Sequence, residues 1–228
     1  MSDALGVETT ISGCGRTDAG VHASQFYFYL KTAEELPANF RFFMNKKLPN
    51  GIVFLEHQLV GEQAHVCLDA TSRTYDYFLH DCCDPWLARM SSQVDLSCFK
   101  PDLCAHVFPW LQEQADFRQF CLTPDRHNST IVDISKVTLF GNRERNRFRI
   151  RFVANRFLRG MIRVLVYDLL KIGNGELKAE QFLELLQGRD RGHKVHLAPP
   201  QGLHLTGVSY PYIERDPDLP LQQSLNEL

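Results

Sequence analysis

The sequence lacks the patterns that mark several protein classes. Its seven cysteines, an odd number, include no CxxC pair, and no signal-peptide pattern precedes them. It also has no apolar run of membrane-spanning length, no low-complexity linker and no internal repeat. We therefore expect reduced thiols in a cytoplasmic protein, with no metal site, no membrane association and no sharp domain boundary.

A strong net charge is missing as well. The 228 residues carry a net charge of -2, with 23% charged and 44% hydrophobic residues. This composition is typical of globular proteins and argues against intrinsic disorder. A chain of this length buries a sizeable core without metal or disulfide help. The charge balance excludes a uniformly basic coat, but not a nucleic-acid partner, because the distribution of charge decides that question.

Hydrophobic periodicity predicts the secondary structure. Period-two patterns and turn residues predict strands at 25–30, 51–55, 72–80, 131–140, 143–153 and 203–210. Helical spacing predicts a helix at 101–114 bent near Pro109, one at 155–172 capped by Asn155, and one at 178–187. Antiparallel strands mixed with helices predict an α+β fold, with a largely antiparallel mixed sheet and flanking helices.

Positive charge is concentrated in one window. Residues 136–163 contain nine Lys or Arg and one Glu, a net +8, so the rest of the chain carries -10. On the predicted strand 143–153, arginine occupies every second position up to Arg151, opposite an apolar face. The following helix adds Arg156, Arg159 and Arg163 at helical spacing. Such rows are either a solvated surface or a phosphate-binding one, and the forked guanidinium favours phosphate.

A glycine-rich loop, residues 13–20, contains a lone carboxylate, Asp18, next to Arg16 and Thr17. An Asp in such a loop often only caps a turn through its own backbone. The loop is not a P-loop, because the glycine spacing and the Lys-Ser/Thr pair are missing. The loop alone therefore leaves the role of Asp18 open.

Five motifs together carry a family resemblance. The sequence GRTDAGVHA at 15–23 resembles the signature loop of the tRNA pseudouridine synthase A family. SRTYDY at 72–77, DFRQFC at 116–121, FVANRFLRGMIR at 152–163 and APPQGL at 198–203 resemble further motifs of that family, in family order. The resemblance implies a pseudouridine synthase fold, with two related halves (1–66 and 67–228) that share one catalytic cleft.

The resemblance also implies an activity. The implied enzyme is an isomerase that detaches uracil from ribose and rejoins it through C5, without cofactor or metal. The implied substrate is tRNA, at uridines of the anticodon stem-loop (positions 38–40 of the tRNA), and the implied assembly is a homodimer.

The same resemblance assigns roles to individual residues. Asp18 aligns with the family's nucleophile, and Arg163 with the basic residue that forms an ion pair with it. Arg16 would position the flipped nucleotide, and Tyr75 would stack on the target base. Without the resemblance, Tyr75 would be interpreted as a core aromatic residue and Arg163 as one more member of the arginine row. The candidate contacts to the RNA backbone are Arg147, Arg149, Arg151, Arg156 and Arg159.

One departure from the family keeps a second function open. Family members carry a strand and a helix before the signature loop, whereas here only Ala4-Leu5-Gly6 resembles the end of that helix. We therefore expect a truncated, mis-started or degenerate chain. It is either an active tRNA uridine isomerase or a catalytically silent RNA-binding remnant, with a nucleosidase as a third possibility. His204 and Leu197 are smaller departures, at positions where the family more often has Tyr and a small hydroxyl residue.

Overall fold

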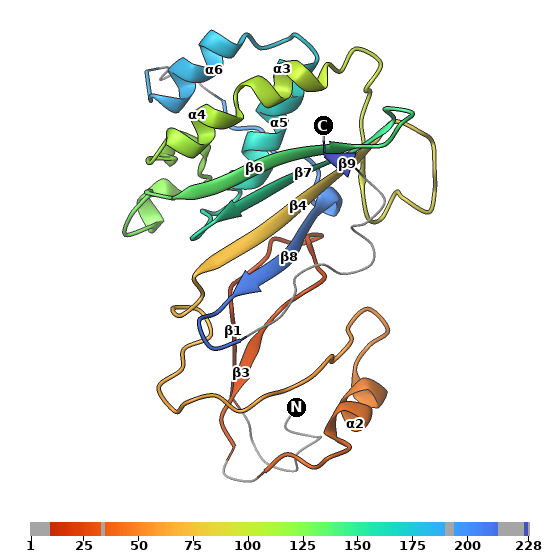
Figure 1. Ribbon diagram of the computed structural model, residues 1–228, viewed down its shortest axis with the longest axis vertical. Coiled ribbons are helices and arrows are strands. Elements are labelled where there is room, and N and C mark those ends of the chain that lie inside the picture. Colours follow the sequence, from red (N-terminus) through yellow and green to blue (C-terminus); the bar gives the residue numbers. More distant parts are fainter. Residues whose placement is uncertain (1–9, 33–34, 190–193, 214–225, 228) are drawn as a thin grey trace. The chain divides into compact units, whose positions relative to one another are not determined.

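The structure, a computed structural model, describes residues 10–32, 35–189, 194–213 and 226–227. The chain divides into two compact units, drawn in Figure 1. The small unit comprises Met1–Arg16 and Tyr27–Asp69, and the large unit comprises Thr17–Phe26 and Ala70–Leu228. Residues 17–26, including Asp18, group with the large unit. The helix end expected at residues 4–6 lies outside the described residues.

The small unit has a short antiparallel ribbon and one helix. β1 (Ile11–Gly13) pairs with β3 (Phe28–Leu30), and α2 (Phe40–Lys47) packs Phe40 and Met44 against Phe54. The strand predicted at 25–30 is therefore shorter than expected. The strand predicted at 51–55 is wrong. The side chain of Asn45 accepts from the N–H of Phe54 at 2.7 Å and donates to its C=O at 2.9 Å, so Asn45 takes the place of a strand partner.

The large unit is built on one mixed sheet. Its strands are β2 (His22–Ala23), β4 (Ser72–His80), β5 (Ser92–Gln93), β6 (Ile134–Gly141), β7 (Arg147–Ala154), β8 (Leu203–Ser209) and β9 (Asn226–Glu227). The order is β2-β8-β4-β7-β6-β9, with β5 beside β4. β2 runs parallel to β8 and β5 parallel to β4, and the other pairs are antiparallel. The predicted α+β class and the largely antiparallel mixed sheet are confirmed.

Helices cover one face of this sheet (Figure 1). They are α3 (Pro101–His106), α4 (Phe108–Glu113), α5 (Met161–Gly173) and α6 (Ala179–Leu186), and three 3-10 turns, η1 (Arg118–Phe120), η2 (Pro124–Arg126) and η3 (Pro200–Gly202), complete the unit. The apolar stripe of α5 is buried against the helix-facing side chains of β4, β6 and β7 in one continuous core. The predicted helix 101–114 is two short helices that meet at Val107.

Two local predictions are wrong for identifiable reasons. Asn155 does not cap α5, because its side chain accepts the N–H of Asp133 at 3.0 Å. The helix instead begins after Gly160, whose φ of 73° is in the left-handed region and where a Cβ would lie 2.7 Å from Leu122. The returning strand starts at Arg147 rather than at residue 143, because Asn142 Oδ1 accepts two backbone N–H groups and holds a longer turn.

Candidate active site in the large unit

The loop that presents Asp18, residues 17–21 (the Asp18 loop), is a tight turn. The N–H of Val21 donates to the C=O of Asp18 at 3.1 Å, and Gly20 has a φ of 81°. A positive φ at the third residue is the mark of a type II turn and favours glycine. A Cβ on Gly20 would lie 3.0 Å from Cγ of Pro200. Glycine therefore allows both the turn and its close approach to the 198–202 segment.

The chain after the turn is fixed to the sheet. His22 and Ala23 of β2 pair with His204 and Leu205 of β8. The N–H groups of Ser24 and Gln25 both donate to the C=O of Leu205. Gln25 is buried, and its Oε1 accepts the N–H of Val208 at 2.9 Å. The C-terminal side of the Asp18 loop is thus held by backbone and buried side-chain hydrogen bonds, and little freedom is left to the turn.

Asp18 faces a cation from α5. Nη1 of Arg163 lies 3.3 Å from Oδ2 of Asp18, with 13% of the arginine side chain and 31% of the aspartate side chain exposed. The same guanidinium donates from Nε to the C=O of Ala198 at 2.7 Å, and the N–H of Ala198 donates to the C=O of Arg163 at 3.0 Å. This charge-assisted fork orients the arginine toward the carboxylate. The structure therefore brings two of the predicted site residues together.

Tyr77 supports the same segment from β4, and no site role was predicted for this residue. Its hydroxyl donates to the C=O of Pro199 at 2.7 Å and is hydrogen-bonded to Ser92 Oγ at 2.8 Å. The ring is fully buried, and this burial raises the pKa of Tyr77 to about 12. A Cβ on Gly202 would lie 2.5 Å from Ser92 Oγ, so the 198–202 segment packs closely here. The second tyrosine of the SRTYDY motif was the signal available for this residue.

Tyr75 and Arg16 are the other two predicted site residues. Tyr75 is half-buried, and its ring meets Phe157 edge-on with centroids 5.2 Å apart. Arg16 is exposed and belongs to the small unit. The roles expected of Tyr75 and Arg16 toward a bound nucleotide stay predictions.

The exposed arginine row expected on β7 is wrong at two positions. Arg149 is only 3% exposed, and its guanidinium carbon lies 3.9 Å from the centroid of the Phe140 ring. Arg151 donates from Nε and Nη2 to the two carboxylate oxygens of Asp76 at 2.8 and 3.0 Å, and Asp76 is fully buried. The alternation of arginine and apolar residues predicted correctly which side chains share a face of β7. The arginine face is itself covered along much of its length.

Three of the predicted RNA contacts remain accessible to a partner. Arg147 keeps 47% of its side chain exposed beside Asp84, with 3.6 Å between the charged atoms. Arg159 is exposed, and Arg156 is half-buried and donates to the C=O of Ser129 at 3.3 Å. Accessible arginines therefore lie at the start of β7 and in the loop between β7 and α5.

Within residues 10–32, 35–189, 194–213 and 226–227, no group of three or more His, Cys, Asp or Glu is arranged to hold a metal ion. In the same residues, no helix combines the length and apolar character needed to cross a bilayer.

Comparison with known proteins places this chain in a class of RNA-modifying enzymes. A family model described as tRNA pseudouridine synthase matches residues 114–211. The chain is 30% identical over 210 residues to tRNA pseudouridine synthase A 2 of Clostridium perfringens, which covers 89% of this chain and 83% of that protein. It is 32% identical over 202 residues to tRNA pseudouridine synthase A of Pseudothermotoga lettingae, covering 86% of this chain and 80% of that protein. The corresponding enzyme of Porphyromonas gingivalis is 29% identical over 206 residues, 88% of this chain and 81% of that protein.

The chain therefore belongs to the tRNA pseudouridine synthase A family, a family of isomerases. The resemblance stated from the five motifs is confirmed at this level.

Proposed function

We propose that this protein converts uridine to pseudouridine in tRNA, with Asp18 as the nucleophile. The observation that carries the proposal is the ion pair of Asp18 with Arg163, made by a loop and a helix that are both fixed within the large unit. A carboxylate presented on a rigid turn beside a counter-charge is suited to covalent attack on a sugar or a base. No metal or cofactor is needed for such an attack.

The reaction is an isomerisation, so its atoms balance within the nucleotide. A carboxylate oxygen of Asp18 attacks the ribose or the uracil ring, and the bond between C1′ and N1 breaks. The base turns, C1′ bonds to C5, and the bond to the Asp18 oxygen breaks, which restores the carboxylate. The C5 proton is lost while N1 gains one. Arg163 keeps the carboxylate in place for the attack. Tyr77 cannot act as the base that removes the C5 proton near neutral pH, because its pKa of about 12 keeps the phenol protonated.

The remaining site residues complete the nucleotide-binding role. Tyr75 would stack on the uracil, and Arg16 would hold the nucleotide after it leaves the RNA helix. Arg147, Arg156 and Arg159 would contact phosphates of the RNA backbone, because they combine positive charge with exposure. The preferred target would be the anticodon stem-loop, and the working form would be a cytoplasmic homodimer.

The decisive experiment compares Asp18→Asn with the unchanged protein. The substitution removes the charge and the nucleophilic oxygen but keeps the shape, so turnover should fall to background while the Kd for tRNA changes little. Turnover is measured as tritium release from C5-labelled uridine in tRNA, and binding is measured by filter retention. Asp102→Asn, at an exposed aspartate in the first turn of α3, is the matched control and should retain full turnover.

Two outcomes would contradict the proposal. Turnover above background in Asp18→Asn would remove Asp18 from the nucleophile role. Binding of tRNA by the unchanged protein without any tritium release would instead identify an RNA-binding protein that has lost the activity of its relatives.

A further inference from the structure

Two histidines are stacked immediately after the Asp18 loop. The ring centroids of His22 and His204 lie 4.7 Å apart with an interplanar angle of 29°. His22 is the first residue of β2, and His204 is its register partner on β8. The stack is therefore built on the same strand pair that fixes the C-terminal side of the Asp18 loop.

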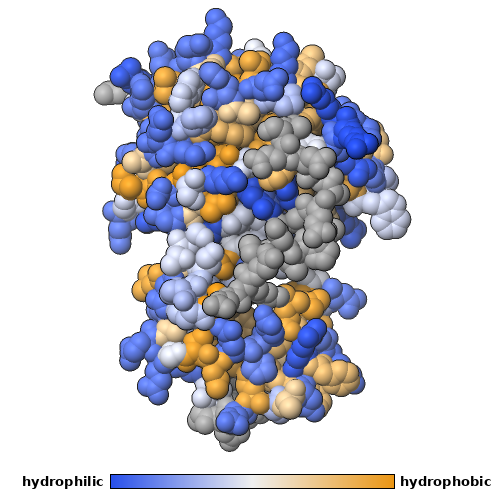
Figure 2. Space-filling view, viewed as in Figure 1, coloured by the Kyte–Doolittle hydropathy of each residue, from blue (hydrophilic) through white to orange (hydrophobic). Residues whose placement is uncertain are grey.

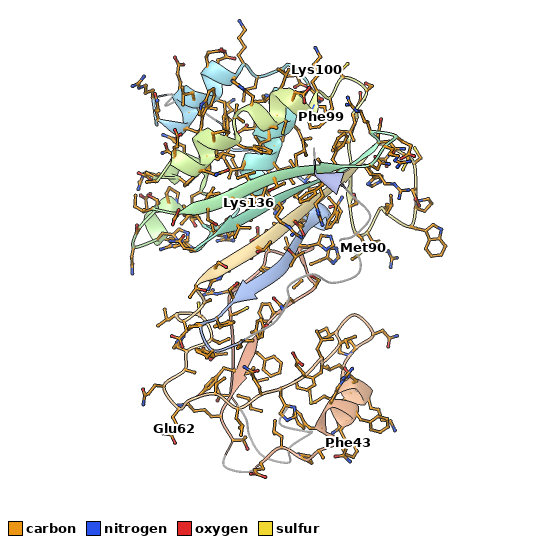
Figure 3. All side chains as sticks on the ribbon, in the orientation of Figure 1. Phe43, Glu62, Met90, Phe99, Lys100 and Lys136 are labelled. Carbon is orange, nitrogen blue, oxygen red and sulfur yellow. The ribbon has the colours of Figure 1, made fainter. Side chains whose placement is uncertain are left out.

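Each ring is tied to the same neighbouring segment. Nε2 of His22 lies 2.8 Å from the C=O of Arg89, and Nε2 of His204 lies 2.8 Å from the C=O of Met90. A carbonyl oxygen only accepts, so Nε2 carries the proton in both rings. Two adjacent carbonyls thus hold two stacked rings, and the chain around Met90, labelled in Figure 3, is joined to β2 and β8.

The surroundings of the stack are mixed in charge. Phe78 of β4 meets the His204 ring edge-on at 5.0 Å. Asp76, also on β4, attracts a positive His204, but it is engaged by the guanidinium of Arg151 on β7. The backbone near the ring contributes two groups that accept hydrogen bonds from His204, at Met90 and at Gln201, while His22 repels a second positive charge. Arg89, which precedes Met90, is also charged, and its side chain is exposed.

We infer that His22 and His204 are positioning residues, which seat the Asp18 loop only while the stacked pair is not doubly protonated. The inference rests on the proposed function. Two imidazolium rings at 4.7 Å repel each other, and screening by water is weak at His204, which is buried beside the half-buried His22. Repulsion at this point separates β2 from β8 and frees the turn that carries Asp18. Protonation of both histidines at acid pH therefore releases the Asp18 loop from its position.

The direction of the pH effect follows from His204. Burial, the largest influence, lowers the pKa of His204 below its ordinary value of 6.5. The protein therefore binds fewer protons when the Asp18 loop is in place than when the loop is released. The state with the loop in place loses stability as the pH falls below about 6.5. Above that pH the stabilisation is complete, and no further gain occurs.

The kinetic test compares kcat for tritium release between pH 7.5 and pH 5.5. His204→Phe keeps a ring against His22 but cannot be charged. Over this pH range the fall in kcat should therefore be at least about fivefold smaller for this variant than for the unchanged protein. His204→Ala removes the ring, so kcat at pH 7.5 should drop about tenfold with an unchanged Kd for tRNA. His106→Gln, at an exposed histidine of α3, should leave the pH profile unchanged.

Contrary results are equally clear. An acid-side fall in His204→Phe that equals that of the unchanged protein would overturn the inference, as would full kcat in His204→Ala at pH 7.5. If His204 had a purely structural role, replacing it would lower the melting temperature but leave the shape of the pH profile unchanged.

A second measurement does not depend on turnover. The Cε1–H resonances of His22 and His204 are followed by NMR in the whole chain and assigned through His22→Gln and His204→Gln. Replacing His22 should raise the titration midpoint of His204, because His22 disfavours a positive charge on that ring. An unchanged His204 midpoint in His22→Gln would overturn the pair, whereas a raised midpoint in a protein without turnover would contradict only the proposed function.

Discussion

At the scale of single residues, the guanidinium of Arg163 performs two tasks that no other side chain combines. Nε donates to the C=O of Ala198, and Nη1 reaches Asp18, so the two bonds leave one rigid plane in different directions. A lysine ammonium is a single point charge on a flexible stem and cannot occupy both positions at once. The orientation of the ion pair therefore depends on arginine and not on positive charge alone.

Arg163→Lys should accordingly lower kcat about tenfold or more, while the Kd for tRNA stays within about twofold. The charge is preserved, but the carboxylate of Asp18 loses its fixed partner. Single-turnover tritium release at saturating enzyme separates the chemical step from binding. Arg189→Lys, at an exposed arginine after α6, is the control and should behave like the unchanged protein. Full turnover in Arg163→Lys would show that charge alone suffices.

Asp168 illustrates a residue that costs stability. It lies on α5, is 3% exposed, and burial raises its pKa to about 7. The folded protein keeps a proton on this carboxyl that the unfolded chain releases near pH 4. Between about pH 4 and pH 7 the folded state therefore binds more protons, and its stability falls as the pH rises through this window.

Asp168→Asn should remove this dependence. The free energy of unfolding of the variant, relative to the unchanged protein, should increase by roughly 1–3 kcal/mol between pH 5 and pH 7.5. Urea unfolding at both pH values measures the difference, and the comparison cancels the contributions of other titrating groups. Parallel pH dependences in the two proteins would show that the carboxyl titrates outside this window.

At the scale of elements, local patterns predicted the strands and helices whose neighbours agree with them. β4 has the expected bounds, and β8 and α6 lie within about a residue of expectation, because alternation, amphipathic spacing and flanking glycines or prolines all agree there. The errors came from long-range contacts. Asn155 looked like a helix cap but serves Asp133, and Arg149 and Arg151 looked exposed but lie on a covered face.

The candidate site shows the same division. The motifs predicted an ion pair of Asp18 with Arg163, and in the structure their charged atoms lie 3.3 Å apart. The SRTYDY motif marked Tyr77, but its hydrogen-bond partners Ser92 and Pro199 could not be predicted, because they come from other segments of the chain. Contacts of this kind depend on strand order, which periodicity does not encode.

The arginines of β7 and of the loop before α5 should therefore behave in two ways. Arg156→Gln with Arg159→Gln should weaken tRNA binding and reduce the slope of log K against log salt by roughly 1–2, one for each lost phosphate contact. Arg151→Gln should leave that slope unchanged and instead destabilise the fold by about 3–5 kcal/mol, because Asp76 is left buried without its cation. Filter binding across salt concentrations and urea unfolding measure the two effects. An unchanged slope in the double variant would make this surface a solvated one.

At the scale of the whole molecule, the two units differ sharply in how much apolar surface they bury. In the described residues, the small unit buries only Phe40, Met44 and Phe54 in its cluster, whereas the large unit has a continuous core from β4 to α6. The small unit also leaves large apolar side chains exposed, and Figure 2 shows them on its surface. Phe42 is 59% exposed and Phe43, labelled in Figure 3, is 46% exposed.

This imbalance predicts that the small unit opens before the large one. A two-stranded ribbon and an eight-residue helix over three buried side chains contribute little free energy against local unfolding. Amide hydrogen exchange of the whole chain, read by mass spectrometry, should therefore show residues 40–47 at least about 100-fold less protected than β4, β7 and α5. The comparison with α6, a helix of the same length in the large unit, controls for helix length. Protection of α2 equal to that of α6 would show that the small unit is stabilised as strongly as the large one, against the imbalance of their cores.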